Sequence, residues 1–298
     1  MHYIAYCYDG TPEVGRLDPA SGKIQVLDLQ PDECETGVTA VVLRDANGNP
    51  PAPSGVERQL ADVEIRAPFP RPSRNIFCVG KNYYEHAQEF ASSGFDSSAA
   101  AGAVPKAPIV FSKVPESVTA HGQPIPINAA VTEAVDYEAE LAVVIGRGGR
   151  GIRKADALNH VWGYTIVNDV TARDIQGRHS QWLLGKSQDG FCPMGPVAVS
   201  ADSFDLDGAQ LRCWVNGELR QNISTSNLIF DVPTLIETIS EGITLYPGDL
   251  IATGTPAGVG IGFDPPKYLQ PGDVVRMEIA GIGVLENPVC RIEEMTHG

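Results

Sequence analysis

The sequence lacks the features that would place the protein in a membrane or on a nucleic acid. No apolar run approaches the length of about 18 residues that a membrane-spanning helix needs. The first residues, MHYIAYCYDGTPEVGR, lack a basic segment followed by an apolar one, so we expect no secretory signal peptide. Lysine and arginine number 22 against 37 acidic residues, which gives a net charge of −15. This acidity argues against nucleic acid or an anionic membrane as a partner.

The cysteine and histidine patterns give no indication of a zinc site. The six cysteines contain no CxxC pair, and the six histidines are widely scattered. A zinc site with the usual ligand spacings is therefore not expected. Without a secretory signal, we expect reduced thiols in a cytoplasmic protein.

The chain of 298 residues is long enough for one large domain, or for one domain and a small companion. YIAYCYD and KIQVLDL predict short strands near the start, and the proline-rich APFPRPSR predicts a linker. We therefore predict a small β-rich N-terminal domain over residues 1–70 and a main domain over 71–298. Strands outnumber helices without a regular βαβα alternation, which disfavours a Rossmann fold or TIM barrel and predicts a β-rich α+β fold.

Local signals predict several individual elements. Asn216-Gly217 predicts the turn of a hairpin. DVPTLIETISEGI predicts a helix with Asp231 as its N-cap, and NYYEHAQEF predicts a helix capped by Asn82. RKADALNHV predicts a short helix, and GQPIPI predicts an edge strand because its prolines cannot donate hydrogen bonds. The small residues from Ala91 to Val104 predict a mobile loop.

The stretch VDYEAELAVVIG begins with carboxylates at every second position and ends as an apolar strand. Because alternate side chains of a strand share a face, Asp136, Glu138 and Glu140 are predicted to lie on one side. Mutual repulsion would be costly there unless a cation sat among them. The alternative is an edge strand whose solvent face is acidic.

A second strand, WGYTIVND, ends in another carboxylate. Asp169 at this sheet rim would complete an all-oxygen triad with Glu138 and Glu140. Hard cations prefer oxygen ligands, so the triad suits Mg²⁺, with Mn²⁺ and Ca²⁺ chemically possible. Asp136 stands at the start of its strand, where solvent exposure is expected.

Seven motifs, from about Val79 to the C-terminus, resemble those of the fumarylacetoacetate hydrolase superfamily. They match in family order, and the shorter branch of acylpyruvate hydrolases, oxaloacetate tautomerases or decarboxylases, and hydroxymuconate-type isomerases is the most similar. The motifs are VGKNYYEHAQE, PIVFSK, VDYEAELAVVIG, GYTIVNDVTARDIQ, QWLLGKSQDGFCPMGP, WVNGELRQ and LIATGTPAGVG. The resemblance implies a mixed β-sandwich or roll as the catalytic domain, a homodimer, and a Mg²⁺ or Mn²⁺ site at Glu138, Glu140 and Asp169.

The resemblance also implies roles for residues outside the triad. His86 and Glu89 stand at i and i+3, which places them on one side of a helix. Alone they could be an incidental surface pair, but the family implies that they orient a water or move a proton, with the segment Ala91 to Val104 as a lid. Arg173, Gln176 and Lys186 are implied to bind an anionic substrate, with Lys186 also stabilising an enolate.

The glycine-rich stretch TGTPAGVGIG is no phosphate-binding loop. It lacks the GK[ST] ending of that motif, and no helical pattern follows it as a dinucleotide fingerprint requires. It is expected to turn backbone N–H groups and the Thr255 hydroxyl toward a ligand, and the resemblance implies that Thr255 contacts substrate. Lys113 is expected just behind the site.

Together these features predict a Mg²⁺-dependent enzyme for a small 2-oxo or 2,4-dioxo acid. Hydrolysis of a C–C bond or isomerisation is favoured, and tautomerisation or decarboxylation of oxaloacetate is the next alternative. The same half-reaction, formation of an enolate, serves all of these outcomes. An alternative of another class is a non-catalytic protein that binds a metal and a dicarboxylate.

Overall fold

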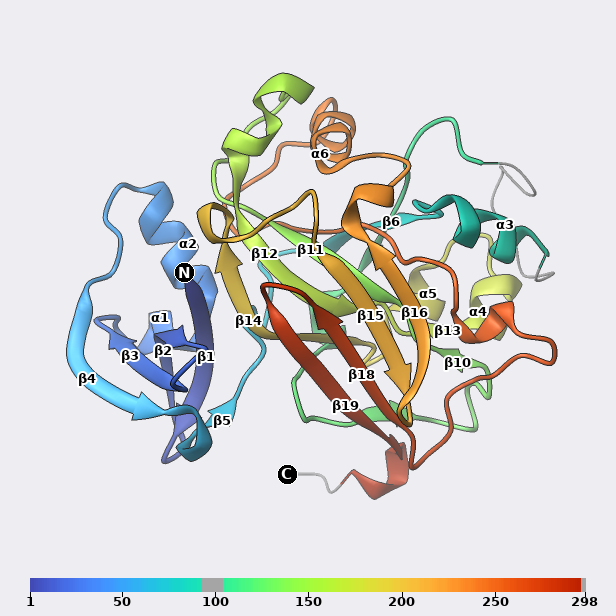
Figure 1. The fold of residues 1–298 in the computed structure, drawn as a ribbon, viewed down its shortest axis with the longest axis horizontal. Helices are drawn as coiled ribbons and strands as arrows, with labels where there is room; N and C mark the ends of the chain where they lie inside the picture. Colours follow the sequence, from blue (N-terminus) through green and yellow to red (C-terminus); the bar gives the residue numbers. More distant parts are fainter. Residues whose placement is uncertain (93–103, 296–298) are drawn as a thin grey trace.

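The computed structural model describes residues 1–92 and 104–295 and shows a strand-rich α+β fold (Figure 1). Its largest element is a twelve-stranded mixed sheet. Ten strands form its main path, in the spatial order β4 (Pro53–Gln59), β3 (Lys23–Leu27), β2 (Thr11–Asp18), β1 (His2–Tyr8), β14 (Cys192–Ser200), β12 (Val161–Asn168), β11 (Ala139–Ile145), β17 (Leu250–Ala252), β6 (Ile76–Gly80) and β7 (Ile109–Lys113). Two short strands join its side, β5 (Glu64–Ile65) on β1 and β8 (Val118–Ala120) on β14.

A second sheet and several short helices complete the fold. The five strands of that sheet run in the order β16 (Glu218–Ser224), β15 (Gln210–Val215), β18 (Val274–Ile279), β19 (Gly283–Arg291) and β9 (Ile125–Ile127). A two-stranded ribbon joins β10 (Val135–Asp136) to β13 (Thr171–Ala172). The α-helices are α1 (Pro31–Glu35), α2 (Val38–Ala46), α3 (Tyr84–Ser92), α4 (Arg173–Arg178), α5 (Leu183–Lys186) and α6 (Val232–Ser240).

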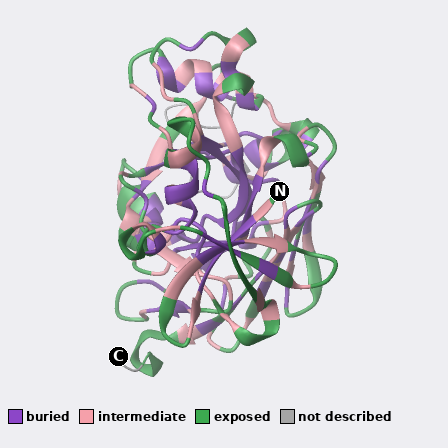
Figure 2. Ribbon diagram, turned by 90° about the vertical axis from the view of Figure 1, so that its left-hand side faces the viewer, coloured by how far each residue is buried: buried purple, intermediate pink, exposed green. Residues whose placement is uncertain are grey.

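The core lies on both sides of β11, which explains the unbroken apolar run of that strand. Leu141 and Val143 belong to an apolar cluster that also includes residues of the second sheet, such as Leu211. Ala142 and Val144 face a different cluster on the opposite side. All seven residues of β11 are buried, and Figure 2 shows the buried residues gathered in the interior. The alternative of an edge strand with an acidic solvent face is therefore wrong.

Most of the local predictions are confirmed. Asn216 and Gly217 adopt positive φ angles of 51° and 79° between β15 and β16, as a tight hairpin requires. The Asp231 side chain accepts a hydrogen bond from the Thr234 N–H at 2.9 Å and caps α6. Strand β9 lies at the edge of its sheet, as the prolines predict.

Two local predictions are corrected by tertiary contacts. The acidic stretch is not one strand, because β10 ends at Asp136 and β11 begins at Ala139. Asn82 is no helix cap, since its side-chain amide donates to the carbonyls of Phe230 and Thr253 at 3.0 and 2.7 Å. The short helix predicted from RKADALNHV is confirmed as a 3₁₀ helix over Lys154–His160.

The N-terminal strands continue the main sheet. Strand β1 pairs antiparallel with β14, with His2 opposite Val199 and Tyr3 opposite Ala198. The Trp162 indole N–H also donates to Asp45 of α2 at 2.6 Å. The domain boundary near residue 70 stays a prediction. Across the described ranges, no helix is long and apolar enough to cross a membrane.

Candidate active site

The pairing of β11 with β12 places three carboxylates together. Ala139 lies opposite Asn168, so Glu138 and Asp169 stand just beyond the paired ends of the two strands. The Asp169 N–H donates to the Glu138 carbonyl at 2.9 Å, which fixes this corner. Oxygen atoms of Glu138, Glu140 and Asp169 all lie within 4.8 Å of one another, and all three residues are buried.

Three cationic side chains from other elements surround these carboxylates. The Lys186 ammonium donates to Glu138 Oε2 at 2.8 Å and to Asp169 Oδ2 at 2.7 Å. Lys113, at the end of β7, donates to Asp169 Oδ1 at 2.7 Å from behind the cluster. Arg173 Nη1 lies 2.8 Å from Glu138 Oε1. Lys113 and Lys186 are nearly inaccessible to solvent, so these contacts form in a region of low dielectric constant.

Glu140 is the carboxylate that these cations do not neutralise. Among the described residues it has no ion-pair partner, and it accepts a hydrogen bond from the Gly254 N–H at 2.8 Å. Burial, followed by the charges of Asp169 and Glu138, raises its pKa well above the usual value. Burial acts in the same direction on Glu138, but Lys186, Arg173 and His86 outweigh it and lower that pKa to about 2.

The carboxylate cluster fits a hard divalent cation. Its donors are all oxygen atoms, which Mg²⁺, Mn²⁺ and Ca²⁺ accept as ligands. A cation bound beside Glu140 would offset the repulsion from Asp169 and Glu138 that favours the protonated form of Glu140. The residues predicted as metal ligands are therefore close enough together, and chemically suited, to hold such an ion.

The sequence predicts that Asp136 lies at a solvent-exposed rim, but the residue is completely buried. Its Oδ2 accepts a hydrogen bond from Arg173 Nε at 2.8 Å. Its Oδ1 accepts from the Gly260 N–H at 2.6 Å. The exposure prediction fails because two distant segments, α4 and the glycine-rich loop, cover the end of β10 and supply these donors.

The predicted pair on α3 is present. His86 Nδ1 lies 3.2 Å from Glu89 Oε2, and the His86 ring is buried while Glu89 is partly exposed. Glu89 is also held by the Gly258 N–H, which donates to Oε1 at 3.0 Å. Since Nδ1 is engaged by Glu89, the Nε2 atom of His86 is the nitrogen left to act on a ligand.

The glycine-rich loop can reach Glu89 because it has no side chains in the way. A Cβ on Gly262 would lie 1.8 Å from Glu89 Oε1, and one on Gly258 would lie 1.9 Å from the Arg220 carbonyl. Gly258 also has a φ of +100°, which disfavours other residues. Thr255 in the same loop accepts a hydrogen bond from the Gln221 amide at 2.8 Å. The N–H groups of Gly254, Gly258, Gly260 and Ile261 in this loop donate to carboxylates of the protein itself, so the prediction that the loop turns its N–H groups toward a ligand stays a prediction.

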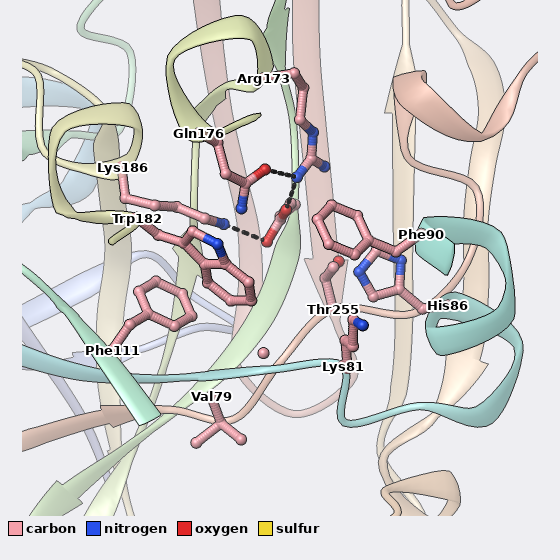
Figure 3. A pocket seen from close by; sticks show the side chains of 12 residues that line it. Val79, Lys81, His86, Phe90, Phe111, Arg173, Gln176, Trp182, Lys186 and Thr255 are labelled. Atoms are coloured by element: carbon pink, nitrogen blue, oxygen red, sulfur yellow. Dashed lines mark hydrogen bonds and ion pairs between the residues drawn. The ribbon is translucent and has the colours of Figure 1, made fainter. Parts of the chain in front are cut away.

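A cavity lies in front of Glu138 (Figure 3). Arg173, Gln176 and Lys186 line one side, and His86 faces them from α3 on the other. Thr255 also lines the cavity, whereas Lys113 is not in its wall. Most residues that were predicted to bind substrate or move protons therefore surround one space. Most of the lid predicted for Ala91 to Val104 lies outside the described residues.

Sequence reasoning missed a positively charged and aromatic part of the wall. Lys81 lines the cavity, and its ammonium lies 5.4 Å from the centre of the Phe90 ring. Phe111 and Trp182 also line it, with ring centres 5.2 Å apart in an edge-to-face arrangement. The motifs GKNYYEH, PIVFSK and QWLLGK contain these residues, but no spacing rule distinguishes them from ordinary core side chains.

Comparison with known proteins identifies relatives of this architecture. A family model described as fumarylacetoacetate (FAA) hydrolase C-terminal matches residues 75–290. The oxaloacetate tautomerase YisK of Bacillus subtilis is 51% identical over 231 residues, which cover 77% of this chain and 74% of the relative. The mitochondrial oxaloacetate tautomerase fahd2 of Xenopus laevis is 44% identical over 232 residues, which cover 77% and 69% of the two chains.

Solved structures extend the likeness to the N-terminal strands. A fumarylacetoacetate hydrolase of Exiguobacterium antarcticum is 41% identical with a TM-score of 0.82, covering 98% of this chain and 99% of the other. A 2-hydroxyhepta-2,4-diene-1,7-dioate isomerase of Mycobacterium marinum is 33% identical with a TM-score of 0.77, covering 99% and 100%. The shorter branch that the motifs suggested is thus confirmed by relatives named as tautomerases and isomerases.

Proposed function

Because this chain belongs to the fumarylacetoacetate hydrolase family, we propose that it is a Mg²⁺-dependent oxaloacetate tautomerase. Such an enzyme interconverts the keto and enol forms of a four-carbon 2-oxo dicarboxylate. Two relatives, 51% and 44% identical, carry this name, and members of the family are enzymes that act on small oxo acids. These names move our preference from C–C hydrolysis or isomerisation, which the motifs favour, to tautomerisation of oxaloacetate, which was the next alternative.

The observation that carries the proposal is the all-oxygen cluster of Glu138, Glu140 and Asp169, of which Glu138 lines the cavity. Lys81, Arg173 and Lys186 line the cavity. They provide local positive charge for a dianion in a chain whose net charge is −15.

The three carboxylates would hold Mg²⁺, which when bound supplies Lewis-acid polarisation of a carbonyl group. Arg173 uses its unbonded Nη2 to bind a substrate carboxylate, and Gln176 supports it by accepting a hydrogen bond from Nη1 at 3.1 Å. The Lys186 ammonium stabilises negative charge that develops on the enol oxygen. The Phe111 ring, centred 5.1 Å from that ammonium, lines the same cavity.

His86 moves the proton. Its Nε2 atom takes a proton from carbon 3 of the keto form, while Glu89 holds the imidazole through Nδ1. His86 releases this proton to solvent, and solvent supplies the proton that ends on the enol oxygen. The reverse sequence returns the keto form, so atoms and charge balance in both directions.

A second candidate is hydrolysis of an acylpyruvate. The His86–Glu89 pair favours it, because the same imidazole can activate a water for attack on a carbonyl carbon. The two reactions share the enolate and differ in whether water or a proton reacts next. Decarboxylation of oxaloacetate would use the same residues.

An assay of keto–enol exchange tests the proposal. Crystalline enol oxaloacetate is dissolved with enzyme, and the keto form is followed with an excess of a dehydrogenase that consumes only that form. We expect Mg²⁺-dependent acceleration over buffer, and its loss in His86→Asn. Parallel measurement of CO₂ from oxaloacetate and of pyruvate from acylpyruvates separates the alternatives. Mg²⁺-dependent binding of oxalate without turnover of any of these acids would instead identify a non-catalytic binding protein.

The homodimer implied by the family resemblance stays a prediction, because the structure describes one chain. Light scattering of the purified protein measures its mass in solution. A mass near twice 31.8 kDa is expected.

A further inference from the structure

The Arg173 guanidinium contacts three neighbouring side chains and has one nitrogen, Nη2, without a hydrogen-bond partner among the described residues. Its Nε donates to Asp136 at 2.8 Å, and its Nη1 contacts Glu138 at 2.8 Å and Gln176 at 3.1 Å. Its Nη2 is buried and has no hydrogen-bond partner among the described residues. Buried donors without partners are rare, so an unpaired one in a cavity wall indicates a position that a ligand fills.

Asp136 accepts four hydrogen bonds, and every donor is an N–H group. Oδ1 accepts from the backbone of Tyr137 at 2.9 Å and of Gly260 at 2.6 Å. Oδ2 accepts from the Ile261 backbone at 3.0 Å and from Arg173 Nε at 2.8 Å. Three backbone contacts fix the carboxylate in place, so it forms a rigid support for the guanidinium.

We propose that Asp136 is a positioning residue that orients Arg173 so that Nη2 alone points into the cavity and binds a carboxylate of the substrate. A guanidinium is planar, so fixing Nε and Nη1 also fixes the direction of Nη2. The Phe90 ring, centred 5.8 Å from the guanidinium carbon, borders the same group and limits its movement out of plane. This inference rests on the proposed function, because the ligand is taken to be an oxo acid.

Asp136 also links Arg173 to the opposite side of the site. Gly260 and Ile261, which it binds, belong to the same loop as Gly258, whose N–H holds Glu89 at 3.0 Å. One buried carboxylate therefore sets the spacing between the substrate-binding arginine and the loop that supports the histidine pair. Sequence distance hides this link, since Asp136 and Gly260 are 124 residues apart.

The substitution Asp136→Asn tests the inference with little change of shape. An asparagine amide has one accepting oxygen, so it can satisfy two of the four N–H donors and must turn its own N–H₂ toward the others. We expect calorimetry with Mg²⁺ and oxalate, a small dicarboxylate, to show affinity about tenfold weaker than wild type. Affinity equal to or tighter than wild type would overturn the inference, because removal of a neighbouring negative charge alone favours anion binding.

A matched control separates positioning from general destabilisation. Asp249 is also buried and accepts from Arg74 Nε at 2.7 Å and from the Tyr246 N–H at 2.6 Å, but neither partner lines the cavity. Asp249→Asn should lower thermal stability and leave oxalate affinity unchanged. If both variants weaken oxalate binding equally, the role of Asp136 is structural and the inference fails.

Arg173→Lys covers the case in which Asp136→Asn does not fold. Lysine keeps the positive charge but has one nitrogen on a flexible chain, so it cannot bind Asp136 and aim a second donor. We expect the dissociation constant for oxalate to rise about tenfold in this variant as well. Wild-type affinity in this variant would show that charge without orientation suffices, and would overturn the inference. Wild-type protein that fails to bind oxalate with Mg²⁺ would overturn the proposed function as well.

Discussion

Replacement of Glu140 by glutamine separates the metal-binding role of the carboxylate cluster from its structural role. Glu140 is 1% exposed, and its partner in the described part of the chain is the Gly254 N–H at 2.8 Å. Glutamine keeps its shape and can still accept that bond through its oxygen. It cannot ionise, so it removes one of the three negative charges available to a cation.

The metal-free protein should tolerate Glu140→Gln well. Burial and two neighbouring carboxylates raise the pKa of Glu140 well above its unfolded value of 4.5. Above pH 4.5 the unfolded chain loses this proton while the folded chain retains it, so stability falls as pH rises from 4.5 to the folded pKa. The variant lacks this loss, and we expect metal-free Glu140→Gln to be at least as stable as wild type at pH 7.

Mg²⁺ should reverse this order. A ligand at 100 times its dissociation constant stabilises a folded protein by about 2.7 kcal/mol. With an unfolding entropy of about 2.1 cal/mol/K per residue, each kcal/mol raises the melting temperature of this chain of 298 residues by about 1.6 °C, which gives about 4 °C in all. Glu140→Gln should lose most of this shift, because one of the three proposed ligands has become a neutral amide.

Differential scanning calorimetry in EDTA and in excess Mg²⁺ measures both effects. Glu116→Gln is a suitable control, since Glu116 pairs with Arg71 on the surface, where its side chain is 55% exposed. That variant should keep the full Mg²⁺ shift. If Glu140→Gln also keeps it, the cluster does not bind the metal, and the reasoning from its oxygen donors and raised pKa is refuted.

Three further predictions concern the same site. His86→Asn should lower turnover about a hundredfold or more while oxalate binding with Mg²⁺ persists, and a collapse of oxalate affinity in calorimetry would contradict its role in proton transfer. Lys186→Met leaves Glu138 and Asp169 without the ammonium they share. Urea titration of the metal-free protein should therefore show a free energy of unfolding lower by about 3 to 5 kcal/mol, and an unchanged midpoint would disprove this. The folded pKa of Glu138 is lowered to about 2, so its contribution to stability is present above pH 4.5 and is lost as pH falls toward 2. The free energy of unfolding of Glu138→Gln should therefore fall less steeply than that of wild type between pH 5 and pH 3, as measured by urea titrations.

Several features were predictable because neighbours in the sequence decide them. The Asn216-Gly217 turn and the Asp231 cap depend on a few adjacent residues, and both formed as expected. Glu138 and Glu140 lie close together because they are two residues apart where β11 begins, with Glu138 just before its first residue, Ala139. Asp169 was predicted from its place at the end of the strand WGYTIVND, and the i, i+3 spacing paired His86 with Glu89, whereas the family motifs supplied the role of that pair.

Burial and pairing between distant segments were decided by the tertiary structure. Asp136 appeared exposed because its strand begins there, yet a loop 124 residues away covers it. Asn82 resembled a helix cap, but its amide instead binds the carbonyls of Phe230 and Thr253. The sequence by itself determined which chemical groups were available and the local turns and helix cap, because these depend on residue type and short-range periodicity. Which carboxylate meets a cation and which remains unneutralised depends on packing between strands and loops far apart in the chain, and only the folded structure sets that.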